Sequence, residues 1–130
     1  MADLTKERFD SNSIEYETPL SLFTPLDKEF NFTIDVCATH ENKKVQNCYT
    51  LKENALIQDW EGVCWCNPPY GREMPKWLRK AYETAETGMG TVVMLIPART
   101  NTTWWHDICM KQEVRFIKGR PKFHKGKAEV

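Results

Sequence analysis

The sequence has no run of about 18 consecutive apolar residues, which is the length that a helix needs to cross a membrane. Its first ten residues, MADLTKERFD, are polar and charged, so we expect no secretory signal peptide. The five cysteines are an odd number and include no C-x-x-C pair, so a secreted disulfide scaffold is not expected. We therefore expect an intracellular protein with reduced thiols and no membrane partner.

Two short cysteine patterns raise the alternative of a zinc site. Cys37 and His40 form a C-x-x-H pair, and Cys64 and Cys66 form a C-x-C pair. Structural zinc sites use C-x₂₋₄-C pairs, and cysteines two apart in a strand point to the same face, as buried small apolar residues do. We expect thiols packed in the core and no metal.

The sequence has no net charge, because 18 basic residues balance 18 acidic ones. The two halves differ, however: residues 1–62 carry 6 basic and 12 acidic residues, and residues 63–130 carry 12 and 6. Between 111 and 127 there are seven basic residues and one acidic residue, and Lys122 and Lys125 are candidate phosphate contacts. The stretch suits a polyanion, although a solvated basic face without such a partner fits the charge equally well.

The apolar pattern predicts alternating strands and helices. Strands are expected over residues 30–38, 63–66, 91–96 and 114–117, and helices over residues 75–87 and 102–112. This order implies right-handed crossovers and a parallel sheet, in which ligands bind at the carboxyl ends of the strands. We expect one α/β domain over residues 16–130, preceded by a flexible segment over residues 1–15.

An earlier helix is expected to begin at Thr18 and Pro19. Threonine is a good N-cap, and proline fits the first helical position. Pro25 is expected to kink or end this helix, because proline lacks the amide hydrogen that the helix requires.

The strongest chemical signal is the motif Asn67-Pro68-Pro69-Tyr70, which follows a predicted strand and precedes a predicted helix. The Asn67 side-chain oxygen and the Pro68 carbonyl are two acceptors that could polarise a planar amino group. Proline fixes its own φ and so holds that carbonyl in place. Tyr70 offers a ring on which a base can stack. The bland alternative is a rigid Pro-Pro turn with a packed tyrosine.

The order of several sequence blocks resembles the phage-type DNA N6-adenine methyltransferase (Dam) family. The likeness runs from about residue 16 to residue 123 and is carried by a series of blocks in fixed order: Thr18-Pro19, Ile34-Asp35-Val36-Cys37-Ala38, Gln58-Asp59-Trp60, Asn67-Pro68-Pro69-Tyr70, Ile96-Pro97-Ala98-Arg99-Thr100, Trp104-Trp105 and Ile117-Lys118-Gly119-Arg120-Pro121-Lys122-Phe123.

The resemblance implies a compact Rossmann-like methyltransferase fold, S-adenosylmethionine as methyl donor, and double-stranded DNA as partner. It implies an adenine-specific DNA methyltransferase in a bacterial host, encoded by a phage or prophage. The site residues that it implies fall into three groups. The catalytic residues are Asn67, Pro68, Pro69 and Tyr70. The cofactor-binding residues are Thr18, Pro19, Asp35, Cys37, Ala38, Asp59 and Trp60. Arg99 and Arg120 join Lys122 and Lys125 as DNA-binding candidates.

Two departures from this pattern leave alternatives open. No glycine follows the first predicted strand, where many methyltransferases have a glycine-rich turn. The resemblance also implies a final strand after Phe123, whereas this sequence ends at Val130, so the sheet is expected to lack its last strand. A truncated domain that binds DNA or a partner without turnover, and an enzyme that methylates RNA or protein amines, are the alternatives. The ribose-binding acid is expected within residues 39–58, where Glu41 and Glu53 are unsupported candidates.

Overall fold

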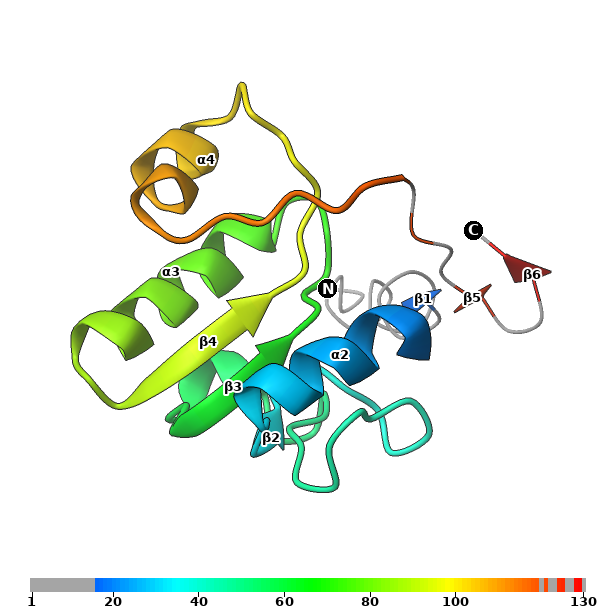
Figure 1. Ribbon diagram of the computed structural model, residues 1–130. Helices are drawn as coiled ribbons and strands as arrows, with labels where there is room; N and C mark the ends of the chain where they lie inside the picture. Colours follow the sequence, from blue (N-terminus) through cyan, green and yellow to red (C-terminus); the bar gives the residue numbers. More distant parts are fainter. Residues whose placement is uncertain (1–15, 120, 122–123, 126–127, 130) are drawn as a thin grey trace, which may run out of the picture.

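The computed structural model describes residues 16–119, 121, 124–125 and 128–129 (Figure 1). The helices and 3-10 turns are α2 (Leu20–Phe30), η2 (Ala55–Ile57), α3 (Met74–Glu86), α4 (Thr103–Asp107) and η3 (Cys109–Lys111). The strands are β1 (Tyr16–Glu17), β2 (Ile34–Asp35), β3 (Gly62–Cys66), β4 (Gly90–Met94), β5 (His124–Lys125) and β6 (Ala128–Glu129). None of the helices in these residues is long and apolar enough to cross a membrane. The predicted flexible segment 1–15 lies outside the described residues.

A three-stranded parallel sheet forms the centre of the molecule, in the order β2-β3-β4. The predicted parallel sheet is therefore confirmed, and β3, α3 and β4 lie close to the ranges expected from the sequence. The expected strand 30–38 is shorter, since only Ile34 and Asp35 form β2. Backbone bonds from Thr33 and Val36 to β3 continue the pairing by one residue at each end.

The sheet is covered by a different helix on each face, with α3 behind it and α2 in front of it in Figure 1. On the α3 face, a buried cluster joins β2, β3, η2 and α3; its members are Ile34, Val36, Ala55, Trp60, Cys64, Cys66, Trp77 and Ala81. On the α2 face, Phe23, Phe32 and Trp65 form a second buried cluster. Because Trp65 lies between Cys64 and Cys66, its side chain points to the opposite face.

Helix α2 begins one residue later than expected and continues through its proline. Pro19 is the N-cap and no side chain caps the helix, so the predicted N-cap at Thr18 is wrong. The Thr18 hydroxyl contacts Asn67 instead. Pro25 lies inside the helix and does not end it. Both Pro25 and Ser21, whose carbonyl loses its helical partner, are exposed, so water can satisfy that carbonyl.

A second sheet, which the sequence pattern did not predict, joins distant parts of the chain. Its order is β1-β5-β6, with antiparallel pairing of Tyr16 with Lys125 and of Glu17 with His124. This ladder holds the segment immediately before Thr18 and α2.

The region after β4 departs most from expectation. The predicted helix 102–112 divides at Ile108, which is the C-cap of α4 and the N-cap of η3, with φ −118° and ψ −60°. Residues 114–117 form no strand, and in the part of the chain that the structure describes no strand pairs with the outer edge of β4. The predicted strand 114–117 is therefore wrong. The β4 residues Val92, Val93 and Met94 are only half-buried as a result.

Gly62, the first residue of β3, can be compared with Gly88 to test the contact between Thr33 and the start of β3. Its φ is +78°, and a Cβ atom there would lie 2.5 Å from Thr33 Oγ1, which hydrogen-bonds both to the Val63 amide and to its carbonyl. Gly88 has nearly the same φ, +76°, with no atom within 4 Å of such a Cβ. We expect Gly88→Ala to cost about 1–2 kcal/mol for its backbone conformation alone. Gly62→Ala should cost at least about 1 kcal/mol more, because of the overlap.

Urea unfolding of both variants measures this difference. Equal losses of unfolding free energy would show that Thr33 does not hold β2 against β3 as described.

Candidate functional site

The carboxyl ends of the three parallel strands form one edge, and the predicted motifs come together there. Val36 donates its amide to Trp65 O at 3.0 Å, and Leu95 donates to Cys66 O at 3.0 Å. These bonds set the residues after β2, β3 and β4 side by side. Asp35 ends β2, Asn67 follows β3, and Ile96 and Pro97 follow β4. This is the edge at which ligands bind in sheets of this kind.

The loop 67–70 is rigid and closely packed. Pro68 and Pro69 are buried, while Asn67 is half-buried and Tyr70 is 37% exposed. The Tyr70 hydroxyl donates to Leu95 O at 3.3 Å, and burial raises the pKa of this phenol, so that it remains neutral. Gly71, with φ +100°, turns the chain into α3. The two prolines thus hold Asn67 and the Pro68 carbonyl at the rim of the sheet.

Thr18 and Asn67, which are 49 residues apart, are in direct contact. The Asn67 Nδ2 donates to Thr18 Oγ1 at 2.9 Å. The Thr18 side chain is only 3% exposed, and Pro19 follows it with φ −65° and ψ 141°. The structure therefore unites the predicted cofactor motif at Thr18 and Pro19 with the predicted catalytic loop.

Asp35 is a buried carboxyl group that organises the chain after β2. Its Oδ1 accepts from the Cys37 amide at 3.1 Å, and its Oδ2 accepts from the Lys44 amide at 3.0 Å. Ala38, which is buried, donates its own amide to Tyr49 O at 3.1 Å. Asp35, Cys37 and Ala38 therefore lie together at the carboxyl end of β2, close to the loop at Asn67.

Lys44 and Glu17 belong to this region, and the sequence analysis missed both. Lys44 Nζ donates to Glu17 Oε1 at 2.8 Å, and the Lys44 side chain is 8% exposed. The pair connects the loop that caps Asp35 to the strand that precedes Thr18. No sequence pattern indicates it, because the two residues lie in separate segments with no shared period. Glu53, a candidate ribose-binding acid, accepts from the amide and hydroxyl of Thr50 instead.

The burial of Asp35 predicts a pH-dependent stability. Desolvation raises its pKa from 3.8 to about 6, and the two backbone amides and Lys44 offset this only partly. The folded protein thus binds the proton more tightly than the unfolded chain does. This contribution to stability is present below pH 4 and is lost as the pH rises through 6. Two pKa units correspond to about 3 kcal/mol.

The prediction is checked by urea unfolding of the parent and of Asp35→Asn between pH 4 and pH 7. The stability of the parent relative to the variant should fall by about 2–3 kcal/mol over that range. Taking the difference removes the contributions of other carboxylates, such as Glu53, whose pKa is lowered by its bonds to Thr50. A difference that is independent of pH would contradict the prediction.

Asp59 and Trp60 are not brought to this edge. Both precede β3, whereas Asn67 follows it, so one five-residue strand of roughly 17 Å separates them from the loop. The Asp59 side chain is exposed, and the Asp59 carbonyl accepts from the Tyr49 hydroxyl at 2.8 Å. Trp60 is 1% exposed, packs on Trp77, and donates its indole N–H to Ala55 O at 2.8 Å. In this position Trp60 serves the core.

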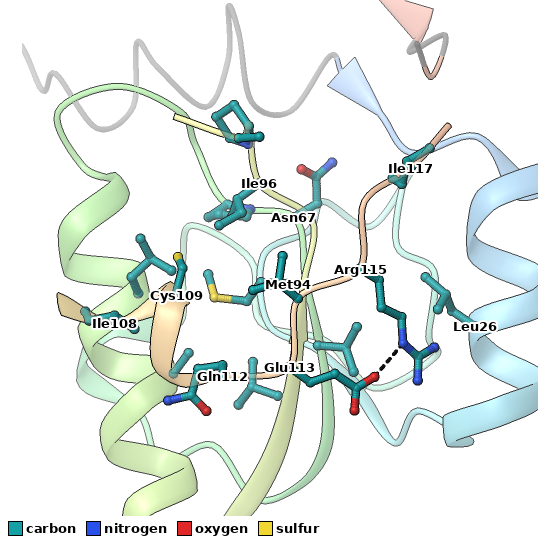
Figure 2. A pocket seen from close by; sticks show the side chains of 18 of the residues that line it. Leu26, Asn67, Met94, Ile96, Ile108, Cys109, Gln112, Glu113, Arg115 and Ile117 are labelled. Carbon is teal, nitrogen blue, oxygen red and sulfur yellow. Dashed lines mark hydrogen bonds and ion pairs between the residues drawn. The ribbon is translucent and has the colours of Figure 1, made fainter. Parts of the chain in front are cut away.

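A large groove runs from the loop at Asn67 along the outer edge of β4. Its volume is about 1270 Å³, and its walls come from α2, α3, β4, η3 and the segment 112–117. Figure 2 shows Asn67 and Ile96 at one end of it and Gln112 and Glu113 at the other. The lining is largely apolar, and Asn67, Pro68 and Tyr70 supply the polar groups at the loop end.

The basic residues of the second half are used in different ways. Arg99 is exposed in the segment after β4, close to the carboxyl edge. Arg115 forms two bonds to Glu29, at 2.8 and 2.7 Å, and one to Glu113 at 2.6 Å, and it lies 5.4 Å from the Phe30 ring centre. It therefore ties the segment 112–117 to α2. Arg120, Lys122 and the Lys125 side chain lie outside the described residues.

Three of the five cysteines, Cys64, Cys66 and Cys109, are buried in the core, whereas Cys37 and Cys48 are half-buried. Cys64 and Cys66 are fully buried in β3, and burial raises the pKa of both thiols. Within residues 16–119 and the few described beyond them, no group of three histidine, cysteine, aspartate or glutamate side chains is arranged to hold a metal ion.

Comparison with known proteins identifies the family. The model of the DNA N-6-adenine-methyltransferase (Dam) family matches residues 6–129. A DNA N-6-adenine-methyltransferase of Haemophilus phage HP1 is 38% identical over 105 residues, which are 78% of this chain and 60% of that protein. One of Escherichia phage T1 is 30% identical over 93 residues, 69% of this chain and 38% of that protein.

The chain thus spans about 60% or less of the length of these two relatives. No solved structure matches it significantly. With a family match across nearly all of its sequence and two relatives of the same description, the chain belongs to the DNA N-6-adenine-methyltransferase (Dam) family.

Proposed function

We propose that this chain transfers a methyl group from S-adenosylmethionine to the N6 amine of adenine in DNA, on a Rossmann-like methyltransferase fold. The observation that carries the proposal is the loop Asn67-Pro68-Pro69-Tyr70 at the carboxyl edge of a parallel sheet, in a chain of this family. The family membership supports the reaction, and the loop supplies groups that suit it.

The exocyclic amine of adenine is a weak nucleophile, because its lone pair is delocalised into the ring. The Asn67 carbonyl oxygen and the Pro68 backbone carbonyl would each accept one of its two N–H hydrogens. Two acceptors on one nitrogen increase the electron density there and turn the lone pair toward the methyl donor. The buried prolines hold both acceptors before the substrate arrives, and such preorganisation lowers the cost of alignment.

The residues after β2 fit the proposed cofactor. S-adenosylmethionine carries a sulfonium and an amino group, and when bound it supplies an electrophilic methyl group. Asp35 is a buried carboxyl whose pKa is raised by desolvation, and a nearby cationic ligand would favour its ionised form. We assign Asp35, Cys37, Ala38 and the Thr18-Pro19 backbone to this site. Asp59 and Trp60 lie at the other end of β3 and are left out of it.

An adenine within duplex DNA cannot reach this loop and would have to be flipped out of the stack. The exposed part of the Tyr70 ring offers a surface for stacking, which is worth about 1–3 kcal/mol per base. The loop end of the groove would receive the base. Arg99, exposed near the carboxyl edge, is placed to contact phosphate, and the basic residues beyond 117 extend the same charge.

The test is a methylation assay on the 130-residue chain. The protein is incubated with labelled S-adenosylmethionine and unmethylated phage DNA, RNA or casein in parallel, and the first two are digested to nucleosides. N6-methyladenine from DNA alone is the expected product. Product formed only with RNA or only with casein would show that the methyl acceptor is RNA or protein and not DNA. Quenching of tryptophan fluorescence by the cofactor without any product would favour a binding module.

A further inference from the structure

The loop that follows β2 closes around Asp35. The Asp35 amide donates to Asn47 O at 3.0 Å, and the Asp35 carbonyl accepts from the Tyr49 amide at 2.9 Å. In the side chain, Oδ1 accepts from the Cys37 amide and Oδ2 accepts from the Lys44 amide. A carboxylate has about four acceptor sites, so these two bonds leave room for a further donor. Asp35 is therefore held firmly and can still accept a cationic ligand.

Side-chain hydrogen bonds give this loop its turn, although no glycine follows β2 before Gly62. The Thr39 amide donates to Asn42 Oδ1 at 2.7 Å, and the Asn42 amide donates to Thr39 Oγ1 at 3.0 Å. The Lys43 amide donates to Thr39 O at 3.0 Å. Such bonds between side chains and nearby backbone groups define a turn without glycine. The turn brings the amide of the next residue, Lys44, to Asp35.

The Lys44 side chain anchors the same loop to the strand that precedes Thr18. Its Nζ donates to Glu17 Oε1 at 2.8 Å, and the side chain of Lys44 is 8% exposed, whereas that of Glu17 is 44% exposed. A buried ammonium group is costly without an anion beside it, so Lys44 is confined to the place where Glu17 lies. Glu17 is itself held by its pairing with His124 in the β1-β5 ladder. The ion pair thus fixes the residue whose amide donates to Asp35.

Lys44 also acts on the charge state of Asp35. Desolvation raises the pKa of Asp35 to about 6, and both the amide and the ammonium group of Lys44 oppose this rise. The thiols of Cys37, Cys48 and Cys66 act electrostatically with this group, but burial raises their own pKa values, so they are neutral at pH 7. Among the described residues, Lys44 is therefore the charged side chain that favours the ionised carboxyl.

We propose that Lys44 is a positioning residue of the cofactor site: its ammonium group, paired with Glu17, holds the loop that presents the Asp35 carboxylate to a cationic group of S-adenosylmethionine. This inference rests on the proposed function. S-adenosylmethionine carries two cationic groups and one carboxylate, so the loss of a nearby positive charge would by itself strengthen its binding. If Lys44 acts through Asp35, its removal weakens binding instead.

Lys44→Met removes the ammonium group, keeps an apolar stem and leaves Glu17 accessible to water. From tryptophan fluorescence, we expect the Kd for S-adenosylmethionine to rise about tenfold at pH 6.5, as for a lost bond to a charged group. The rise should be smaller at pH 8.5, where Asp35 is more fully ionised in both proteins. Lys44→Gln, a second neutral variant, should change the Kd in the same direction, and Lys44→Arg should restore most of the affinity.

Lys43→Met is the matched control, because it makes the same change of charge one residue earlier. It should change the Kd less than about threefold, as expected for a charge that is not held in a buried pair. Equal losses in Lys43→Met and Lys44→Met, or tighter binding by Lys44→Met, would overturn the proposal.

A titration without cofactor separates this inference from the proposed function. In protein labelled with carbon-13 at the aspartate carboxyl groups, the Asp35 signal is assigned by its loss in Asp35→Asn. Its midpoint should move to higher pH by about half a unit or more in Lys44→Met and should stay in place in Lys43→Met. An unmoved midpoint in Lys44→Met overturns the inference. A raised midpoint in a chain that binds no S-adenosylmethionine supports the action of Lys44 on Asp35 and counts against the proposed function alone.

Discussion

Asn67→Ala is expected to lower the kcat for DNA methylation about 10²–10³-fold, which is the usual effect of removing one preorganised polar group from the reacting atoms. The variant loses the side-chain acceptor and keeps the Pro68 carbonyl, so some activity should remain. The loss should appear in kcat, because the acceptor acts on charge that develops during transfer. DNA affinity, measured by fluorescence anisotropy, should change only a few-fold.

Asn67→Asp is the matched control. It has nearly the same shape and accepts hydrogen bonds through both oxygens, and the Thr18 hydroxyl can donate to it instead of accepting. We expect it to keep activity within about tenfold of the parent. If the alanine variant were as active as the parent, with the same product, the loop would have no part in the chemistry.

Trp65→Ala is expected to destabilise the fold by about 3–5 kcal/mol, the range measured when a large buried aromatic side chain is removed. Trp65 is 1% exposed and packs edge-on against Phe23, with ring centres 5.2 Å apart, and against Phe32 at 5.5 Å. These contacts attach α2 to the sheet, and Thr18 lies directly before α2. The loss should therefore also loosen the contact between Thr18 and Asn67.

Thermal and urea unfolding of Trp65→Ala, Trp65→Phe and Trp104→Ala test this. The alanine variant should melt about 10–20 °C lower, given the size of the chain. The phenylalanine variant should lose less, because a ring remains between Phe23 and Phe32. Trp104 is half-buried and outside this cluster, so its removal should cost less than that of Trp65. Similar losses for Trp65→Ala and Trp104→Ala would contradict the described core.

The elements whose residues carry a clear apolar period could be predicted from the sequence. The apolar run after Gly90 and the helical spacing of Trp77 and Ala81 gave β4 and α3 nearly to the residue. The parallel order followed from their alternation. The same reasoning failed at residues 114–117, where the composition suits a strand. A strand also requires a neighbour to pair with, and no local pattern supplies one.

The sequence also predicted the position of part of the candidate site. The predicted parallel order placed Asn67 and the residues after Asp35 in one region, because parallel strands end at one edge, and the family resemblance added Thr18. The specific partners could not be predicted, since they join residues far apart in sequence. Arg115 belongs to the basic stretch 111–127, whose charge suits a polyanion or a solvated face equally, yet it binds Glu29, 86 residues away. Thr18 has the composition of a helix cap, and its hydroxyl contacts Asn67 instead.

The ladder between β1 and β5 imposes an order of assembly on a growing chain. The parallel strands, Asp35 and the Asn67 loop can all form from residues made earlier, but Glu17 pairs with His124. At a synthesis rate of about 5–20 residues per second, roughly 5–20 s pass between the two. Contacts so distant in sequence also form slowly within a finished chain. During that interval the parallel sheet can be folded, while β1, which directly precedes Thr18, has not yet paired with β5.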